Sequence, residues 1–249
     1  MFTPQTRAFL RKTKQLVWAP LILRDYLTFR SLDTKKKFQA RLKDFYPQVK
    51  DKTVSTSFDR HYVYHTAWAA RKVREINPVR HVDISSSLYF SAIISAFLPV
   101  DFYDYRPADL VLDNLRSAHA NVTKLPFPDN SVPSISCMHT IEHIGLGRYG
   151  DPIDPEAHVT AIKELVRVTE PGGFIIFVVP IGKQPKIEFN AHRIFTYKIV
   201  CELFDSAELV EFSLIPEHEG PMRLHAREKD IGDEQFACGC FLFQKENHS

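Results

Sequence analysis

The feature that most constrains the fold is a strand–helix–strand pattern in the middle of the chain. Residues 132–138 are expected to form a buried strand, and residues 174–179, FIIFVV, form an unbroken apolar run. An unbroken run of this length fits a strand covered on both faces, as in a parallel sheet. Residues 156–169 repeat apolar side chains with a helical period, and Glu170-Pro-Gly-Gly173 would end that helix. The pattern predicts a βαβ unit and therefore an α/β fold.

A His-x-x-Glu-His run directly follows the first of these strands. His139, Glu142 and His143 lie within five positions, and ligands of open α/β sheets bind at the carboxyl ends of strands. Inverted zinc proteases share this spacing, but they need a helix there, and Gly145 leaves room for about one turn. The run therefore predicts a functional site and disfavours a protease.

The flanking residues supply the other elements of such a sheet. Apolar periodicity predicts strands at 80–84, 99–103, 207–214 and 235–244, and helices at 59–73, 88–97 and 196–204. The last two strands are expected to form an antiparallel hairpin. Residues 216–233 show no periodicity and form either a substrate lid or an insertion without chemical importance. The helix at 59–73 carries histidines and aromatic side chains that either face the site or pack inside the fold.

Several motifs in this region resemble a known family. Leu125-Pro-Phe-Pro-Asp-Asn-Ser131, Glu164-Leu-Val-Arg-Val168 and Glu170-Pro-Gly-Gly173 are similar to the later half of class I methyltransferases that use S-adenosylmethionine. The run from Glu142 to Pro155, with Phe189-Asn-Ala-His-Arg193 downstream, further resembles the methyltransferase-like family DUF268. The resemblance implies a Rossmann-like, mostly parallel sheet with an antiparallel terminal hairpin, and S-adenosylmethionine as cofactor.

The resemblance places one cofactor loop after the first strand. Val82-Asp-Ile-Ser-Ser-Ser87 stands where the family has an acid-x-Gly-x-Gly loop, so Asp83, Ser85 and Ser87 are expected near the cofactor. Glycines at these positions let the backbone approach the ligand closely, and serines replace them here. Small hydroxyl side chains could still contact a carboxylate. Alternatively, the serines only cap the following helix.

Further cofactor contacts are expected after the next strands. Asp104, with Tyr105 beside it, matches the acid that holds the ribose hydroxyls in the family, and a carboxylate can accept two hydroxyl hydrogen bonds. Asn121 and Val122 match the pair that meets the adenine, and His139 would pack under the cofactor. In the alternative interpretation, Asp104 only opens a turn and Asn121 is an ordinary loop residue.

Two mechanisms remain open for the histidine run. Some related methyltransferases that modify a vicinal diol bind a divalent ion here, so the resemblance implies a metal site of His139, Glu142, His143 and His192. Several imidazoles with one carboxylate favour a transition metal, which would lower the pKa of the acceptor hydroxyl. Without a metal, His143 would act as the catalytic base, with Glu142 beside it.

The loops after the strands at 132–138 and 174–179 are rich in polar groups that could bind an acceptor. The expected acceptor-binding residues are Arg148, Asp151, Asp154, His192 and Arg193. These side chains favour a hydroxyl of a sugar, glycan or nucleotide sugar, and the family resemblance alone suggests polysaccharide biosynthesis. Two other classes stay open. One is a scaffold that lost cofactor use with its glycines, and the other is an RNA-modifying methyltransferase, although nucleic acid is the less favoured partner.

Charge is distributed unevenly along the 249 residues. Residues 1–53 carry 13 Lys and Arg against four Asp, whereas the whole chain carries a net charge of only +2. We expect a basic, helical N-terminal extension over 1–57 and an α/β domain over 58–249. The apolar run 16–23 suits shallow contact with an anionic membrane surface, or packing on the domain or on a second copy of the chain.

The cellular compartment and the state of the cysteines are predicted from patterns that the sequence lacks. No apolar run approaches about 18 residues, and the N-terminus lacks a signal-peptide arrangement, so we expect a cytoplasmic protein, at most peripheral to the inner face of the membrane. The four cysteines lack the spacing of a zinc knuckle and are expected to be buried, reduced thiols: Cys137, Cys201, Cys238 and Cys240.

Overall fold

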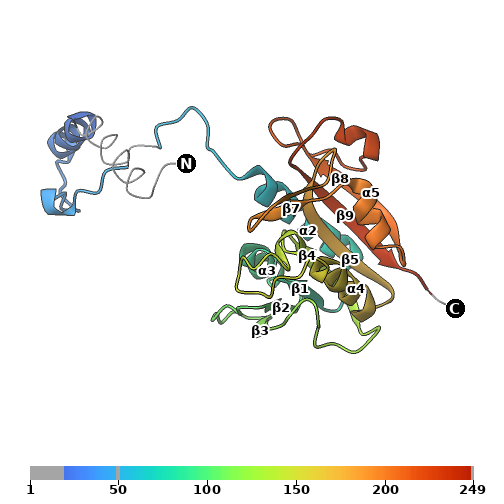
Figure 1. Cartoon of the computed structure of the whole chain (residues 1–249). Coiled ribbons are helices and arrows are strands. Elements are labelled where there is room, and N and C mark those ends of the chain that lie inside the picture. Colours follow the sequence, from blue (N-terminus) through green and yellow to red (C-terminus); the bar gives the residue numbers. More distant parts are fainter. Residues whose placement is uncertain (1–19, 49–50, 248–249) are drawn as a thin grey trace. The chain divides into compact units, whose positions relative to one another are not determined.

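A computed structural model describes residues 20–48 and 51–247 of the chain (Figure 1). The chain divides into two compact units, Met1–Phe58 and Asp59–Ser249. In the first unit, residues 20–32 are helical, and a short 3-10 turn, η1, covers Leu42–Asp44. The apolar run 16–23 begins outside the described residues. Across the described part of the chain, no helix has the length and apolar character needed to cross a membrane.

The second unit is built on a seven-stranded sheet with the order β3-β2-β1-β4-β5-β9-β8. The strands are β1 (His81–Ile84), β2 (Val100–Asp104), β3 (Leu115–His119), β4 (Val132–Met138), β5 (Thr169–Ile181), β8 (Ala207–Ile215) and β9 (Ala237–Lys245). The first five run parallel, whereas β9 pairs antiparallel with both β5 and β8. The predicted sheet with an antiparallel terminal hairpin is confirmed.

Four helices cover the two faces of this sheet (Figure 1): α2 (Arg60–Ile76), α3 (Leu88–Ile94), α4 (Ala157–Val168) and α5 (Tyr197–Leu203). Helices α2 and α3 share a core cluster with Met138 and Val178, while α4 and α5 share another with Cys137 and Phe177. Neighbouring residues of a strand point to opposite faces, so the two clusters lie on opposite sides of the sheet.

Side-chain caps mark where α2 and α5 begin. Asp59 precedes α2 and its carboxylate accepts a hydrogen bond from the Tyr62 backbone N–H, at 3.1 Å. Thr196 caps α5 in the same way, because its hydroxyl oxygen accepts a hydrogen bond from the Ile199 backbone N–H at 3.2 Å. Each cap satisfies a backbone donor that a helix start otherwise leaves unpaired.

Three features depart from the expected elements. β3 and a small hairpin of β6 (Lys186–Glu188) and β7 (His192–Ile194) were not expected. Both are short and polar, so they lack an apolar period. The Pro-Gly-Gly segment lies inside β5, because that strand already begins at Thr169.

A buried polar network ties β1 to β4. Ser136 Oγ donates to Asp83 Oδ1 at 2.6 Å, and Ser91 donates to the other carboxylate oxygen. His81 lies between Ser134 Oγ, at 2.8 Å, and Ser136 Oγ, at 2.9 Å. Burial lowers the pKa of His81 to about 3, so the ring is neutral. Because Ser136 gives its proton to Asp83, the His81 Nε2–H donates to Ser136.

This network makes stability depend on pH. Burial raises the pKa of Asp83 from 3.8 to about 6, in spite of its serine donors. The folded state therefore holds this proton more tightly than the unfolded chain, and we predict that the free energy of unfolding falls as the pH rises from about 4 to about 6. Two pKa units correspond to about 3 kcal/mol.

Urea unfolding of the wild type and of Asp83→Asn across this pH window measures the effect. The amide does not titrate, so the variant should lack this part of the decline. Equal pH slopes in the two proteins would contradict the prediction.

Candidate functional site

A cavity of about 610 Å³ opens where the parallel strands end. Twelve of the residues singled out from the sequence line it: Ser85, Asp104, Tyr105, Asn121, Val122, His139, Glu142, His143, Arg148, Asp151, Asp154 and His192. Asp83, Ser87 and Arg193 are not among the lining residues. The structure therefore gathers most of the predicted site around one cavity.

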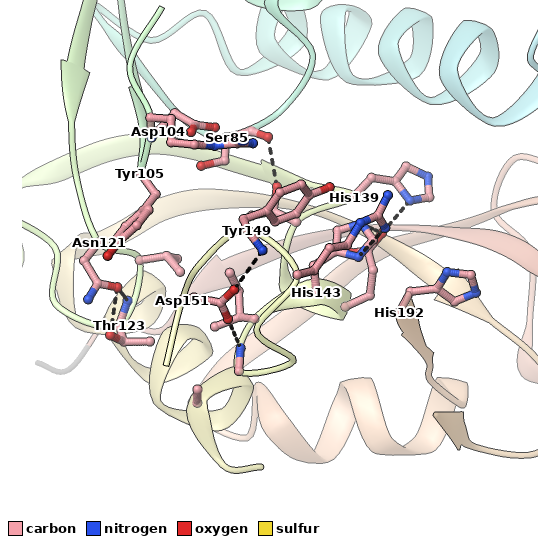
Figure 2. Close-up of a pocket in the computed structure, with 18 of the residues that line it drawn as sticks. Ser85, Asp104, Tyr105, Asn121, Thr123, His139, His143, Tyr149, Asp151 and His192 are labelled. Carbon is pink, nitrogen blue, oxygen red and sulfur yellow. Dashed lines mark hydrogen bonds and ion pairs between the residues drawn. The ribbon is translucent and has the colours of Figure 1, made fainter. Parts of the chain in front are cut away.

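The cavity has two chemically different ends (Figure 2). Ser85, Asp104, Tyr105 and Asn121 lie toward one side, whereas His139, His143 and His192 lie toward the other. The loop that carries Tyr149 and Asp151 runs between these groups. One end therefore offers hydroxyl, carboxylate and amide groups, and the other offers imidazoles.

The loop after β1 keeps a glycine-like backbone without glycine. Ser85 has φ +55°, in the left-handed region that glycine favours. Thr140 Oγ1 donates to the Ser85 carbonyl at 3.0 Å, and Ser86 Oγ accepts from the Met138 N–H at 3.0 Å. Ser87 makes no side-chain capping bond to α3. The hydroxyls of Thr140 and Ser86 therefore tie this loop to the end of β4.

Asp104 and Asn121 are both fixed by turns at the cavity wall. Asp104 Oδ1 accepts from the Arg106 N–H at 2.7 Å. Asn121 Oδ1 accepts from the Thr123 N–H at 3.0 Å and from its hydroxyl at 2.8 Å. These bonds hold both side chains in place before any ligand arrives. They also engage the amide oxygen of Asn121, which leaves its NH₂ group as the donor.

His139 connects β4 to β9. Its backbone is left-handed, with φ +53°. Its Nδ1 lies 2.9 Å from Glu142 Oε1, and its Nε2 lies 3.4 Å from Cys238 Sγ. Burial alone would lower the pKa of His139, but Cys238 and Glu142 outweigh burial and raise the pKa to about 10. The ring is therefore held between the Glu142 carboxylate on one side and the Cys238 thiol on the other.

His143 lies one turn further on, in η2 (Ile141–His143), and is held differently. Its Nδ1 is 2.6 Å from the Ala191 carbonyl, which also accepts from Arg148 at 2.9 Å. Arg148 Nη1 is also 3.1 Å from Nδ1, but it already donates to the same carbonyl, and the shorter 2.6 Å contact favours the proton on Nδ1. Nε2 is then the basic nitrogen. Burial lowers the pKa of His143. The ring is therefore neutral near pH 7, with Nε2 located 3.8 Å from Glu142 Oε1.

Two residues predicted to bind the acceptor brace the loop between β4 and α4. Asp151 Oδ2 accepts from the Gly145 N–H at 2.7 Å. Arg193, which is buried, donates to the Ile144 carbonyl at 2.6 Å. Gly145 has φ +77°, and a Cβ there would lie 2.0 Å from the Asp154 carbonyl oxygen. The loop path therefore requires glycine at this point.

The predicted metal ligands are not brought together as one set. Across the described parts of the chain, the cluster whose ligand atoms all lie within 4.8 Å of one another is His61, His139 and Cys238. The His143 and His192 ring centroids are 6.4 Å apart, and His143 points its Nδ1 at a backbone carbonyl. The turn at His139 directs its ring toward β9, so a different cluster forms.

Several residues in or next to the cavity were not indicated by the sequence. Tyr149 packs edge-on to His143, with ring centroids 5.6 Å apart, and Arg106 lies 4.7 Å above its ring. Cys238 is separated from His139 by 99 positions, and they meet only through the long-range pairing of β9 with β5. No local pattern could have indicated that contact. For Tyr149, the sequence did offer a signal, because it is an aromatic residue inside the glycine-rich loop.

Two family models match the second unit. One, described as a methyltransferase domain, matches residues 63–177, and the other, described as a Caenorhabditis protein of unknown function, DUF268, matches residues 129–237. Both resemblances indicated by the sequence motifs are therefore confirmed.

The demethylmenaquinone methyltransferase of Geobacillus stearothermophilus is 32% identical over 94 residues, which is 37% of this chain and 35% of that protein. The chain thus matches about a third of the length of this curated relative.

Solved methyltransferases share the fold. The N-methyltransferase NodS from Bradyrhizobium japonicum, in complex with S-adenosyl-L-homocysteine, has a TM-score of 0.53 at 11% identity over 76% of this chain and 88% of that one. The Burkholderia thailandensis 1,6-didemethyltoxoflavin-N1-methyltransferase has a TM-score of 0.53 at 13% identity over 74% and 79%. The second unit therefore has the fold of class I methyltransferases.

The glycine loop gives a prediction with a matched control. Gly145 and Gly150 both have positive φ, but a Cβ at Gly150 meets nothing within 4 Å. Gly150→Ala should cost only the left-handed backbone penalty of about 1–2 kcal/mol. Gly145→Ala adds a clash with backbone and should cost at least about 1 kcal/mol more. Chemical denaturation of both variants measures the difference, and equal stabilities would contradict the tight loop path.

Proposed function

We propose that the chain is an S-adenosylmethionine-dependent O-methyltransferase that acts on a hydroxyl of a polar acceptor, such as a sugar, a glycan or a nucleotide sugar. The observation that carries this proposal is a single cavity with Asp104 at one end and the neutral His143 at the other. The methyltransferase-domain match and the methyltransferases of the same fold support the cofactor.

The residues at the first end fit the cofactor. Ser85 preserves the backbone turn that lets a loop approach a ligand closely. Asp104 lies at the end of β2, where its carboxylate would accept the ribose hydroxyls. Because Thr123 occupies the Asn121 oxygen, the amide NH₂ would donate to a ring nitrogen of the adenine. When bound, S-adenosylmethionine supplies an electrophilic methyl carbon on a positively charged sulfur.

The residues at the other end fit the removal of a proton. A bound cofactor would give up its methyl group to the acceptor oxygen and keep the electron pair of the broken bond on sulfur. His143 Nε2 would take the acceptor hydroxyl proton, because the Ala191 carbonyl orients the ring and accepts from Nδ1–H. The buried Glu142 carboxylate, 3.8 Å away, stabilises the imidazolium that results.

The polar loops favour a hydroxyl-rich acceptor. Arg148, Asp154 and His192 line the cavity near His143, and Tyr149 adds an aromatic face beside them. Charged groups with one aromatic face suit the hydroxyls and ring of a carbohydrate. An apolar acceptor would leave these polar groups unpaired.

Cofactor binding tests the first half of the proposal. We expect calorimetry to show that the full chain binds S-adenosylhomocysteine, and that Asp104→Ala weakens binding by about 1–3 kcal/mol, because two buried hydroxyls lose their acceptor. Asp101→Ala is the matched control, since Asp101 lies on the same strand and does not line the cavity. If the folded wild type gives no binding heat at high ligand concentration, the cofactor proposal is contradicted. The chain would then be a scaffold that does not use the cofactor.

Methyl transfer tests the second half. We expect His143→Ala to lower the rate about 10²–10⁴-fold, the usual contribution of a general base, with cofactor affinity nearly unchanged. Glu142→Gln should also lower the rate, because the imidazolium loses its counter-charge. His218→Ala is the control, since its side chain is 84% exposed and lies outside the cavity. Full activity of both site variants on an acceptor that the wild type methylates would remove His143 from the mechanism.

A further inference from the structure

We propose that the chain binds one Zn²⁺ ion through His61, His139 and Cys238, at a site in the wall of the cavity that is separate from the base His143. This inference concerns metal binding and stands whether or not the chain transfers methyl groups. It replaces the arrangement expected from the histidine run alone, because two of the three ligands come from elsewhere in the chain.

The three side chains already have close to the required spacing. Tetrahedral zinc holds nitrogen at about 2.0–2.1 Å and sulfur at about 2.3 Å, which places ligand atoms about 3.3–3.6 Å apart. His139 Nε2 and Cys238 Sγ are 3.4 Å apart. All three ligand atoms lie within 4.8 Å of one another, so a small rotation of the His61 ring would complete the triangle.

Three separate elements hold these ligands in place. His61 belongs to the first turn of α2, His139 follows β4, and Cys238 lies on β9 opposite Pro180 of β5. The His61 ring is nearly parallel to the His139 ring, with centroids 5.8 Å apart, and also stacks on Phe236 at 5.5 Å. The site is therefore preorganised by the packing of a helix against the sheet.

Glu142 completes the arrangement from the far side of His139. Its Oε1 lies 2.9 Å from His139 Nδ1, which leaves Nε2 directed at Cys238. Histidine ligands of zinc commonly donate their second nitrogen to a carboxylate in this way. Glu142 is only 1% exposed, and its Oε2 is buried without a hydrogen-bond partner among the described residues. A buried, half-satisfied carboxylate calls for positive charge nearby.

The ligand types select the metal. Two imidazoles and one thiolate suit zinc, whereas magnesium and calcium prefer oxygen ligands. Three protein ligands leave a fourth position for water or a substrate atom. His61 and His139 both line the cavity, so this open position faces the space where an acceptor would lie. Cys238 would give up its proton as the ion binds.

The test is a titration of the full chain with Zn²⁺ alone, after chelator treatment and without any S-adenosylmethionine. We expect calorimetry to show one ion per chain. Titration with Co²⁺ should give a thiolate-to-metal charge-transfer band, which reports the sulfur ligand directly. Cys238→Ser should abolish that band, and both Cys238→Ser and His61→Gln should weaken zinc binding at least about 100-fold. Glu142→Gln should weaken it about 10–100-fold.

Cys137→Ser is the matched control, because Cys137 is an equally buried free thiol on β4 outside the cluster. It should bind zinc like the wild type. His61 is partly exposed at the start of α2, so His61→Gln keeps the test valid if Cys238→Ser fails to fold. Absence of stoichiometric zinc binding by the folded wild type, or wild-type affinity in His61→Gln, would overturn the proposal. Either result would leave cofactor binding, which is measured separately, untouched.

Discussion

The parallel pairing of β4 with β1 is the constraint on which the site depends. Its register places Ile84, the last residue of β1, beside Cys137, one residue before the end of β4. The chain must turn sharply there to reach the helices, and it does so through left-handed residues on both strands, Ser85 and His139. The hydrogen bond from Thr140 to the Ser85 carbonyl locks the two turns together. The loop after β1 and the histidine run after β4 are thus tied together at one edge of the sheet.

The same two strands carry polar residues through the core, and these residues are matched in pairs. Ser134 and Ser136 lie on one face of β4 and form hydrogen bonds with His81 and Asp83 of β1. Each hydroxyl is satisfied, so the network costs less than unpaired polar groups would, but the single carboxylate remains expensive to ionise. In return, the network fixes how β1 and β4 align with each other. A shift of register by one residue would separate every partner and bury all of them unpaired.

The sequence predicts those parts of the molecule whose side chains are either unbroken or periodic. Residues 175–179 are all buried, as their unbroken apolar run indicates, whereas 132–138 also buries two serines. β3 is an edge strand with a polar sequence, so tertiary pairing alone makes it a strand. Cavity residues that directly follow strands were also predictable, because the carboxyl ends of parallel strands lie at one edge of the sheet, where ligands bind. The contact of His139 with Cys238 was not, because it depends on the antiparallel return of β9.

One carboxylate links the two chemical centres of the cavity. Glu142 Oε1 lies 2.9 Å from His139 Nδ1 and 3.8 Å from His143 Nε2. An unshared carboxylate would raise the pKa of His143 and keep it protonated, which would prevent it from accepting a proton. His139 Nδ1 is the nearer partner of that oxygen, and His143 Nε2 lies about an ångström farther from it. Burial then dominates at His143 and lowers its pKa. In the proposed mechanism, this lowered pKa keeps the His143 ring neutral and able to accept a proton.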